Sequence, residues 1–251
     1  VDDGGGVYMD DAENHIESCV ITNNYAEDHA GGVYFKAGLM VNCTVNGNSC
    51  GDDGGGIYMD DGRTPLYPML ISCVVTNNSS FDSGGGLSIE GGGQVYNTTF
   101  ANNTGANGGG IRGKSGDGAW SITNSIVYGN DASGSNKSIR LESNLADPSF
   151  DFCAIDTTAN LDLTDVNATN IIWLETSPLV GGLGADSLQL ANMALADAGT
   201  TAGGIADLLP KKDIAGNQRV AGPEVDMGAF ETYVLVTGMD IDLATIDIGV
   251  T

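Results

Sequence analysis

A short glycine-rich motif recurs along the first half of the chain, and it constrains the fold more than any other feature. Two glycines followed by an aliphatic residue start at residues 5, 31, 55, 85 and 109, so successive copies lie 26, 24, 30 and 24 residues apart. Such a period is the signature of stacked structural repeats. A second block keeps register with the first, and its five copies begin at Ser18, Asn42, Ser72, Asn97 and Asn124. Length differences fall between the blocks, so we expect insertions in loops.

Each block alternates apolar and polar residues, which is the pattern of a β-strand. A rung of about 25 residues cannot bury its apolar face alone, whereas rungs stacked roughly 4.8 Å apart share one core and pair every backbone ladder. The sequence therefore predicts an all-β parallel β-helix, with three short strands per rung. Two inward columns of side chains should result: Val7, Val33, Ile57, Leu87 and Ile111, and Ile16, Met40, Leu70, Val95 and Ile122.

An asparagine closes each copy of the second block. In a stack of rungs, identical amides bond from rung to rung, and asparagine tolerates left-handed turn geometry. We therefore expect an asparagine ladder with a structural role. Its members are Asn24, Asn48, Asn78, Asn103 and Asn130.

The charge balance excludes two classes of partner. The chain has 33 acidic and 9 basic residues and a net charge of −24, whereas nucleic acids and anionic membranes are bound through clustered Lys and Arg. No apolar run approaches the roughly 20 residues needed to cross a bilayer, so we expect no direct membrane insertion in this segment. Cations are the natural partners of such a chain.

The rung pattern resembles the right-handed parallel β-helix repeats of bacterial surface proteins, including polymorphic-outer-membrane-type repeats. This resemblance rests on the Cys/Ser/Thr-x-Ile/Val/Phe-x-x-Asn block and on the glycine triplets, and it covers roughly residues 1–140. We expect degenerate rungs to continue to residue 176. The resemblance implies the fold and leaves the function open, because the same solenoid carries adhesins, phage spikes and polysaccharide lyases.

The region 177–233 resembles the C-terminal module of choice-of-anchor β-helix proteins. Ser177-Pro178, the stretch from Asp213 to Arg219 and the stretch from Val225 to Glu231 carry that likeness, although Gly181-Gly182 replaces the usual Asp-Ala-Gly. The resemblance implies an exported, surface-attached protein whose solenoid ends in this module. Since a solenoid end needs a cap, we expect a structural network there, formed by Asp213, Arg219, Asp226 and Glu231.

The last residues, 234–251, resemble a linker and the first strands of a bacterial Ig-like domain of the second group. Val1 also stands partway through a repeat. We therefore expect the chain to be part of a longer multidomain protein, in which its partners include further domains of the same chain.

One column of aspartates precedes the glycine turns and suggests a metal site. In register, the four carboxylates would lie on successive rungs with no lysine among them, and Ca²⁺ accepts carboxylate and carbonyl oxygens in flexible geometry. The alternative is that these side chains are solvated and cap turn amides. The residues are Asp2, Asp28, Asp52 and Asp82.

Two further columns lie on the outward face of the first strand of each rung. Tyr8, Tyr34 and Tyr58 offer aromatic faces that suit sugar rings, although stacking of the rings on one another explains them equally. The next column consists of Asp10, Lys36, Asp60, Glu90 and Lys114. Lys36 stands between two acidic neighbours there, which predicts cross-rung ion pairs of small individual value.

The five cysteines follow no disulfide or metal spacing. Cys19, Cys43 and Cys73 share one column, where small side chains pack beside the asparagine ladder. Cys50 and Cys153 have no partner that the sequence assigns.

No catalytic residues are assigned. Acidic pairs such as Asp10-Asp11 are common at this composition, neither His15 nor His29 is followed by glycine, and no Arg-x-Lys occurs. The leading hypothesis is a non-catalytic scaffold or adhesin of the bacterial cell surface, extracellular, binding glycans or proteins along its lateral face. The alternative is a polysaccharide lyase or glycoside hydrolase, which requires a base or two carboxylates at fixed separation.

Overall fold

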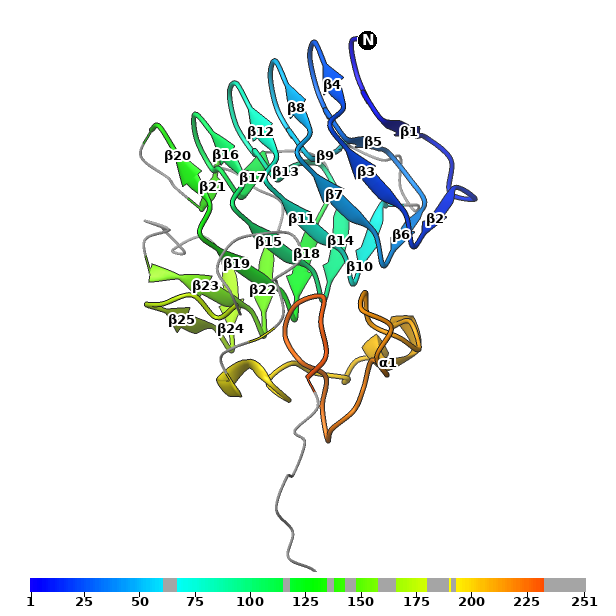
Figure 1. Cartoon of the computed structure of the whole chain (residues 1–251), viewed down its shortest axis with the longest axis vertical. Helices are drawn as coiled ribbons and strands as arrows, with labels where there is room; N and C mark the ends of the chain where they lie inside the picture. The colour runs from blue at the N-terminus through cyan, green and yellow to red at the C-terminus, as the bar shows by residue number, and fades with distance from the viewer. Residues whose placement is uncertain are drawn as a thin grey trace, which may run out of the picture.

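A computed structural model describes residues 1–60, 67–114, 118–134, 138–142, 148–157, 166–179, 190 and 193–232. Within them the chain winds into a parallel β-solenoid whose rungs stack side by side (Figure 1). All pairings between the named strands are parallel and join a strand to its equivalent in the next rung. The predicted all-β parallel solenoid is confirmed.

Three sheets form the walls of the solenoid. Sheet A contains β1 (Val7–Met9), β5 (Val33–Phe35), β9 (Ile57–Met59), β13 (Leu87–Glu90), β17 (Ile111–Lys114) and β21 (Ile139–Leu141). Sheet B contains β2 (His15–Glu17), β6 (Leu39–Val41), β10 (Met69–Ile71), β14 (Gly93–Tyr96), β18 (Trp120–Thr123), β22 (Ser149–Asp151) and β24 (Asn167–Thr169). Sheet C contains β3 (Val20–Thr22), β7 (Thr44–Asn46), β11 (Val74–Thr76), β15 (Thr99–Ala101), β19 (Ile126–Tyr128), β23 (Ala154–Asp156) and β25 (Ile172–Leu174).

A fourth sheet of two-residue strands lines one corner and was not predicted. It contains β4 (Tyr25–Ala26), β8 (Ser49–Cys50), β12 (Ser79–Ser80), β16 (Thr104–Gly105) and β20 (Asp131–Ala132). We number the rungs by their strands, so that rung 1 is β1–β4, rung 2 is β5–β8, and so on to rung 5, β17–β20. In the described part of the chain two less regular rungs follow, and strands continue to Leu174.

The core is a set of inward columns, as the alternation predicts. Registers such as Val33 with Ile57 and Met40 with Leu70 are observed directly. Sheet C adds a third column, in which Val45, Val75 and Phe100 are fully buried. Because each rung adds one apolar residue to every column, the rungs bury one another.

Close backbone approach explains the paired glycines. A β-carbon on Gly86 would lie 2.6 Å from the carbonyl oxygen of Gly110 and 2.8 Å from the amide nitrogen of Asn103. A contact this short forces the backbone or the amide to move. The glycine motif therefore marks the position where one rung rests on the next.

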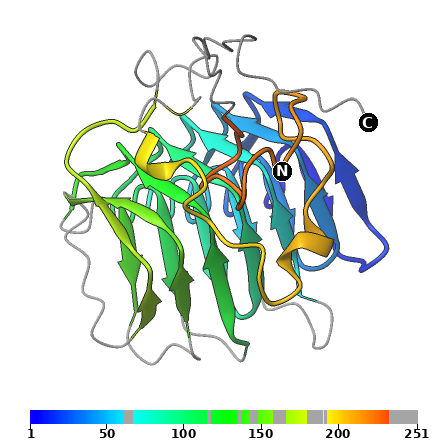
Figure 2. The same ribbon diagram turned by 90° about the horizontal axis from the view of Figure 1, so that it is seen from below.

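The described part of the C-terminal region, residues 193–232, lies along the side of the solenoid (Figures 1 and 2). It contains the 3₁₀ turn η3 (Met193–Leu195) and the short helix α1 (Ile205–Leu208). Three asparagines at the corner between sheets B and C hold it: Asn42 donates to the carbonyl of Lys212 at 3.1 Å, Asn97 to that of Asp226 at 2.9 Å, and Asn124 to that of Thr200 at 2.8 Å.

The described contacts of this segment follow the lateral face of the solenoid from rung 2 to rung 5, whereas the sequence led us to expect a cap at the end of the solenoid. Met227 and Ala229 join the outward apolar residues of sheet C, among them Val74 and Ile126. Apolar burial of that outer face explains the docking.

Candidate functional site

The asparagine column forms a continuous ladder. The side-chain oxygen of Asn78 accepts from the backbone and side-chain nitrogens of Asn48, at 2.9 and 3.0 Å. Asn78 in turn donates to Asn103, and the same pattern runs from Asn24 to Asn130. The ladder residues are not in the left-handed conformation that we expected. The preceding residue adopts it, as at Asn77 with φ 54°.

A second ladder uses the cysteine column. The backbone nitrogen of Cys19 donates to Sγ of Cys43 at 3.4 Å, and that of Cys43 donates to Sγ of Cys73 at 3.3 Å. Thr98 and Ser125 continue the series with their hydroxyl oxygens. The cysteines are free, and all but Cys19 are buried. Burial raises the pKa values of Cys50 and Cys153 to about 12, so these two thiols are protonated and unreactive at neutral pH.

The four aspartates predicted as a metal site are in register through their backbones. The nitrogen of Asp28 donates to the carbonyl of Asp2 at 2.8 Å, and the links from Asp52 to Asp28 and from Asp82 to Asp52 are equivalent. Their carboxylates do not converge. Among the described residues, the one group that brings three metal-ligating side chains within 4.8 Å of one another is His29, Asp52 and Asp53.

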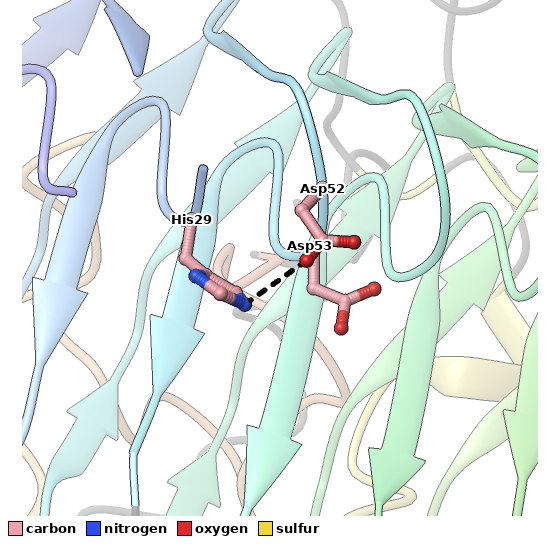
Figure 3. Close-up of side chains that lie close together, drawn as sticks. All are labelled: His29, Asp52 and Asp53. Atoms are coloured by element: carbon pink, nitrogen blue, oxygen red, sulfur yellow. Dashed lines mark ion pairs between the residues drawn. The ribbon is translucent and has the colours of Figure 1, made fainter. Parts of the chain in front are cut away.

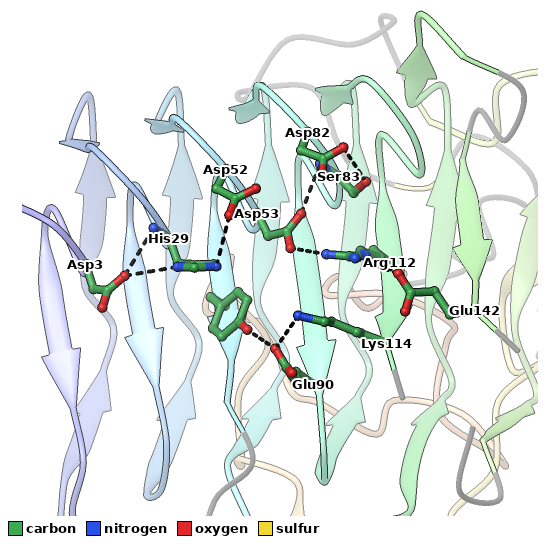
Figure 4. Close-up of polar contacts among 11 residues, drawn as sticks. Asp3, His29, Asp52, Asp53, Asp82, Ser83, Glu90, Arg112, Lys114 and Glu142 are labelled. Carbon is green, nitrogen blue, oxygen red and sulfur yellow. Dashed lines mark hydrogen bonds and ion pairs between the residues drawn. The ribbon is translucent and has the colours of Figure 1, made fainter. Parts of the chain in front are cut away.

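His29 lies between carboxylates of the rungs on both sides of it: Figure 3 shows it beside Asp52 and Asp53, and Figure 4 adds Asp3 on the other side. Its Nε2 is 3.4 Å from Oδ2 of Asp52 in rung 3, and its Nδ1 is 3.2 Å from Oδ1 of Asp3 in rung 1. The same Asp3 oxygen accepts the backbone N–H of His29 at 3.2 Å. The imidazole also packs on Tyr58, with ring centroids 4.6 Å apart. The orientation of the ring is therefore fixed on both sides.

Sequence reasoning missed His29 and Asp53, although a signal was present. The residue that follows each aspartate of the predicted column forms a column of its own, occupied by Asp3, His29, Asp53 and Ser83. The backbone nitrogen of Ser83 donates to Oδ1 of Asp53 at 3.2 Å, which repeats the contact between His29 and Asp3. A histidine with acidic neighbours above and below it in this column indicates the cluster.

Arg112 extends the charged cluster toward rung 5 (Figure 4). Its Nη1 is paired with Oδ2 of Asp53, and its Nη2 lies 2.5 Å from Oε1 of Glu142. The guanidinium thus reaches from rung 5 to rung 3. Ser88 lies between Tyr58 and Arg112 in the same outward column, and its small side chain leaves room for that reach. Burial raises the pKa of Asp53, while Arg112 opposes the rise.

The three tyrosines stack on one another. The rings of Tyr8 and Tyr34 are 4.9 Å apart and 7° from parallel, and those of Tyr34 and Tyr58 are 5.4 Å apart. Tyr8 is 49% exposed, whereas Tyr34 and Tyr58 are 8% and 4% exposed. Lys36 lies 5.9 and 5.4 Å from the ring centroids of Tyr8 and Tyr34. The accessible aromatic surface is therefore the ring of Tyr8 beside the Lys36 ammonium.

Carboxylates from the neighbouring column hold the tyrosine hydroxyls. Tyr34 donates to Oδ2 of Asp60 at 2.8 Å, and Tyr58 donates to Glu90. Burial and these hydrogen bonds raise the pKa of both phenols above the ordinary value. Asp60 and Glu90 are also paired with lysines of adjacent rungs, at 3.3 Å from Lys36 and 3.0 Å from Lys114. The predicted cross-rung ion pairs are thus present, and Figure 4 shows the pair of Lys114 with Glu90.

The predicted C-terminal network lies within the docked segment. Asp213, Arg219, Asp226 and Glu231 are all buried. Arg219 donates to the carbonyls of Gly228 and Asp226 at 2.7 and 3.3 Å, and the backbone nitrogen of Glu231 donates to Asp213 at 2.8 Å. Burial lowers the pKa of Arg219 to about 10, while the neighbouring carboxylates oppose that change. Burial and then repulsion from Asp226 raise the pKa of Glu231 to about 7.

A pocket of about 650 Å³ lies where the docked segment meets the first rungs. Glu17 and Cys19 line one side, and Lys211, Lys212 and Asp213 line the other. The pocket carries both charges and is a consequence of the lateral docking.

The comparisons with known proteins found one family match. Residues 42–60, from β7 into β9, match the Chlamydia polymorphic membrane protein repeat. No match was found among the curated proteins or among the solved structures. In the described residues, no helix has the length and apolar character required to span a membrane. The match lies within residues 1–140, where periodicity indicated a β-helix and where the rung pattern resembles repeats of that type.

Proposed function

We propose that this chain is a non-catalytic, extracellular segment of a bacterial surface protein, a scaffold or adhesin that binds glycans or proteins along its lateral face. One observation supports this function above the others. The side chains of the described rungs repeat as ladders, and their charged groups pair with one another. The match of residues 42–60 to a polymorphic membrane protein repeat supports the surface location.

The outer face of sheet A is the proposed binding surface. It presents the exposed ring of Tyr8, with Lys36 beside it and the ion pairs of Asp60 and Glu90 further along the same face. A flat aromatic ring suits the apolar face of a sugar, and the flanking charges suit its hydroxyls. This chemistry favours a glycan as the first ligand to test.

A glycan array tests this proposal, followed by titration of the best ligand with two tyrosine variants. We expect Tyr8→Ala to weaken binding about tenfold, since loss of an aromatic contact of about 1.4 kcal/mol has that effect. Tyr25→Ala is the matched control, because Tyr25 is 59% exposed but belongs to the fourth sheet. Equal affinities of the two variants would contradict the assignment of this face.

The enzymatic alternative has a separate test. Among the described residues, Arg112 is a basic group that lies close to two carboxylates, and it is paired with both, Asp53 and Glu142. Such pairing favours a structural role. Release of reducing ends or unsaturated products from pectins or glycosaminoglycans, abolished by one acidic substitution, would replace the scaffold proposal with a lyase or hydrolase.

A further inference from the structure

The cluster around His29 offers donors of two chemical types at one point of the lateral edge. An imidazole nitrogen from rung 2 faces two carboxylates from rung 3, with the three ligand atoms within 4.8 Å of one another. We propose that His29, Asp52 and Asp53 bind one divalent transition-metal ion of the zinc class, and that Asp3 orients the histidine from behind.

The hydrogen bonds of His29 indicate which of its ring nitrogens is free to bind a metal. Asp3 is an acceptor for Nδ1, as it is for the backbone N–H of the same residue. A neutral imidazole carries one proton, and this contact places it on Nδ1. The lone pair of Nε2 then faces Oδ2 of Asp52 at 3.4 Å. Two acceptor atoms that face each other repel, and a cation bound between them would remove this repulsion.

The position of Asp3 matches the outer shell of known metal sites. Histidines that bind metals commonly donate their other ring N–H to a carboxylate, which fixes the tautomer and raises the basicity of the ligand nitrogen. Packing on Tyr58 holds the ring plane from a second side. His29 is therefore oriented before any ion arrives, which lowers the ordering cost of binding.

The charges nearby also favour a cation. Asp3, Asp52 and Asp53 lie around His29, and the positive charge of Arg112 is shared between Asp53 and Glu142. Asp53 uses one oxygen for Arg112 and the other for the Ser83 amide. A carboxylate has about four lone-pair sites, so both contacts leave it able to bind an ion.

The donor set distinguishes zinc from calcium. Zinc bonds of about 2.0–2.2 Å to nitrogen and oxygen in tetrahedral geometry separate two ligands by about 3.4 Å, and the distance between His29 Nε2 and Asp52 Oδ2 is 3.4 Å. Calcium takes six to eight oxygens at longer distances. The histidine thus points to a metal different from the Ca²⁺ that the aspartate column suggested.

A bound ion would link neighbouring rungs through its ligands. Its ligands come from rungs 2 and 3, and Asp3 ties the histidine to rung 1. Because stacked repeats are stabilised through contacts between nearest neighbours, an ion here would strengthen the stacking of rungs 1 to 3.

Calorimetric titration of the whole, chelator-treated chain with ZnCl₂ and with CaCl₂ tests the proposal. We expect one Zn²⁺ per chain, with affinity at least tenfold lower in His29→Gln and in Asp52→Asn. Asp3→Asn leaves the three ligands in place and should lower the affinity about 10–100-fold, which is the usual effect of losing an outer-shell partner. Circular dichroism of each variant without metal checks the fold.

The chain supplies its own control, because it has two histidines. His15 lies 3.9 Å from Glu17 on the surface of sheet B, and His15→Gln should bind Zn²⁺ as the wild type does. If His29→Gln is misfolded, Asp52→Asn keeps the test valid, since the Asp52 side chain is 48% exposed. Absence of Zn²⁺ binding, equal loss in the two histidine variants, or a preference for Ca²⁺ would overturn the proposal.

Discussion

Replacing Asn78 with alanine tests how much the asparagine ladder contributes to stability. Asn78 is fully buried in rung 3, and its side chain makes four hydrogen bonds. Its oxygen accepts from the backbone N–H and side chain of Asn48, and its Nδ2 donates to Oδ1 of Asn103 and to the carbonyl of Val45 at 2.9 Å. Asn78→Ala removes all of these side-chain contacts and adds no group that replaces them.

The magnitude follows from the groups that lose a partner. The buried N–H of Asn48 and the carbonyl of Val45 each lose a hydrogen bond, and a buried group without its partner costs about 1–3 kcal/mol. Asn103 keeps the donation from the Asn78 backbone, at 3.0 Å. We therefore expect the free energy of unfolding to fall by about 3–5 kcal/mol.

The matched control is Asn24→Ala, at the first rung of the same ladder. The Asn24 side chain donates to Asn48 at 2.9 Å, and Asn48 keeps the Asn24 backbone donor at 3.0 Å. Its loss should cost about 1 kcal/mol. Urea unfolding at 25 °C, followed by circular dichroism, measures both values. If the free energies of unfolding of the two variants differ by less than about 1 kcal/mol, buried groups that lose their hydrogen-bond partner do not cost what we expect.

Three further predictions concern the core, the glycine contact and the docked segment. Phe100→Ala should lower the free energy of unfolding by about 3–5 kcal/mol, because the side chain is fully buried and leaves a cavity; a loss below about 1 kcal/mol in urea unfolding would contradict this. Gly86→Ala should cost about 1–3 kcal/mol through its contact with the Gly110 carbonyl, measured as a lower thermal midpoint. Folding raises the pKa of Glu231 from 4.5 to about 7. As the pH rises, the unfolded chain therefore loses the Glu231 proton before the folded chain does. Wild-type stability relative to Glu231→Gln should therefore fall between about pH 4.5 and 7 and then level off; a rise over that range would refute the assignment.

The regular part of the fold was readable from the sequence because each rung repeats its spacing. Val33 and Ile57, or Met40 and Leu70, stand at equivalent positions in two blocks, so equal register aligns them and sheet pairing follows. The fourth sheet was missed for the opposite reason. A strand of two residues, such as Ser79–Ser80, has no alternation that periodicity could detect.

Docking of the C-terminal segment could not be read from its local pattern. The predicted members of its network are buried, and they lie within one short stretch of the chain, because Glu231 follows its partner Asp213 by 18 residues. The surface that receives the segment is fixed by Asn97 and Asn124, which lie more than 70 residues earlier and also occupy left-handed turn positions. The sequence pattern indicated Asn97 and Asn124 only as the first residues of two repeat copies, whereas their amide groups bind the segment.

Chemical variety in this solenoid arises where a column departs from its repeat. Tyr58 would stack on another tyrosine in rung 4, but Ser88 takes that place, and its small side chain lets Arg112 reach Asp53. In the neighbouring column His29 stands between Asp3 and Asp53. The histidine adds nitrogen donors to a column whose neighbouring members offer carboxylate oxygens. A repeat fixes where each side chain lies, so a single substitution in one rung meets partners whose positions are already set. For that reason the departures from the repeat, more than the repeat itself, indicate where this chain should be tested for ligand binding.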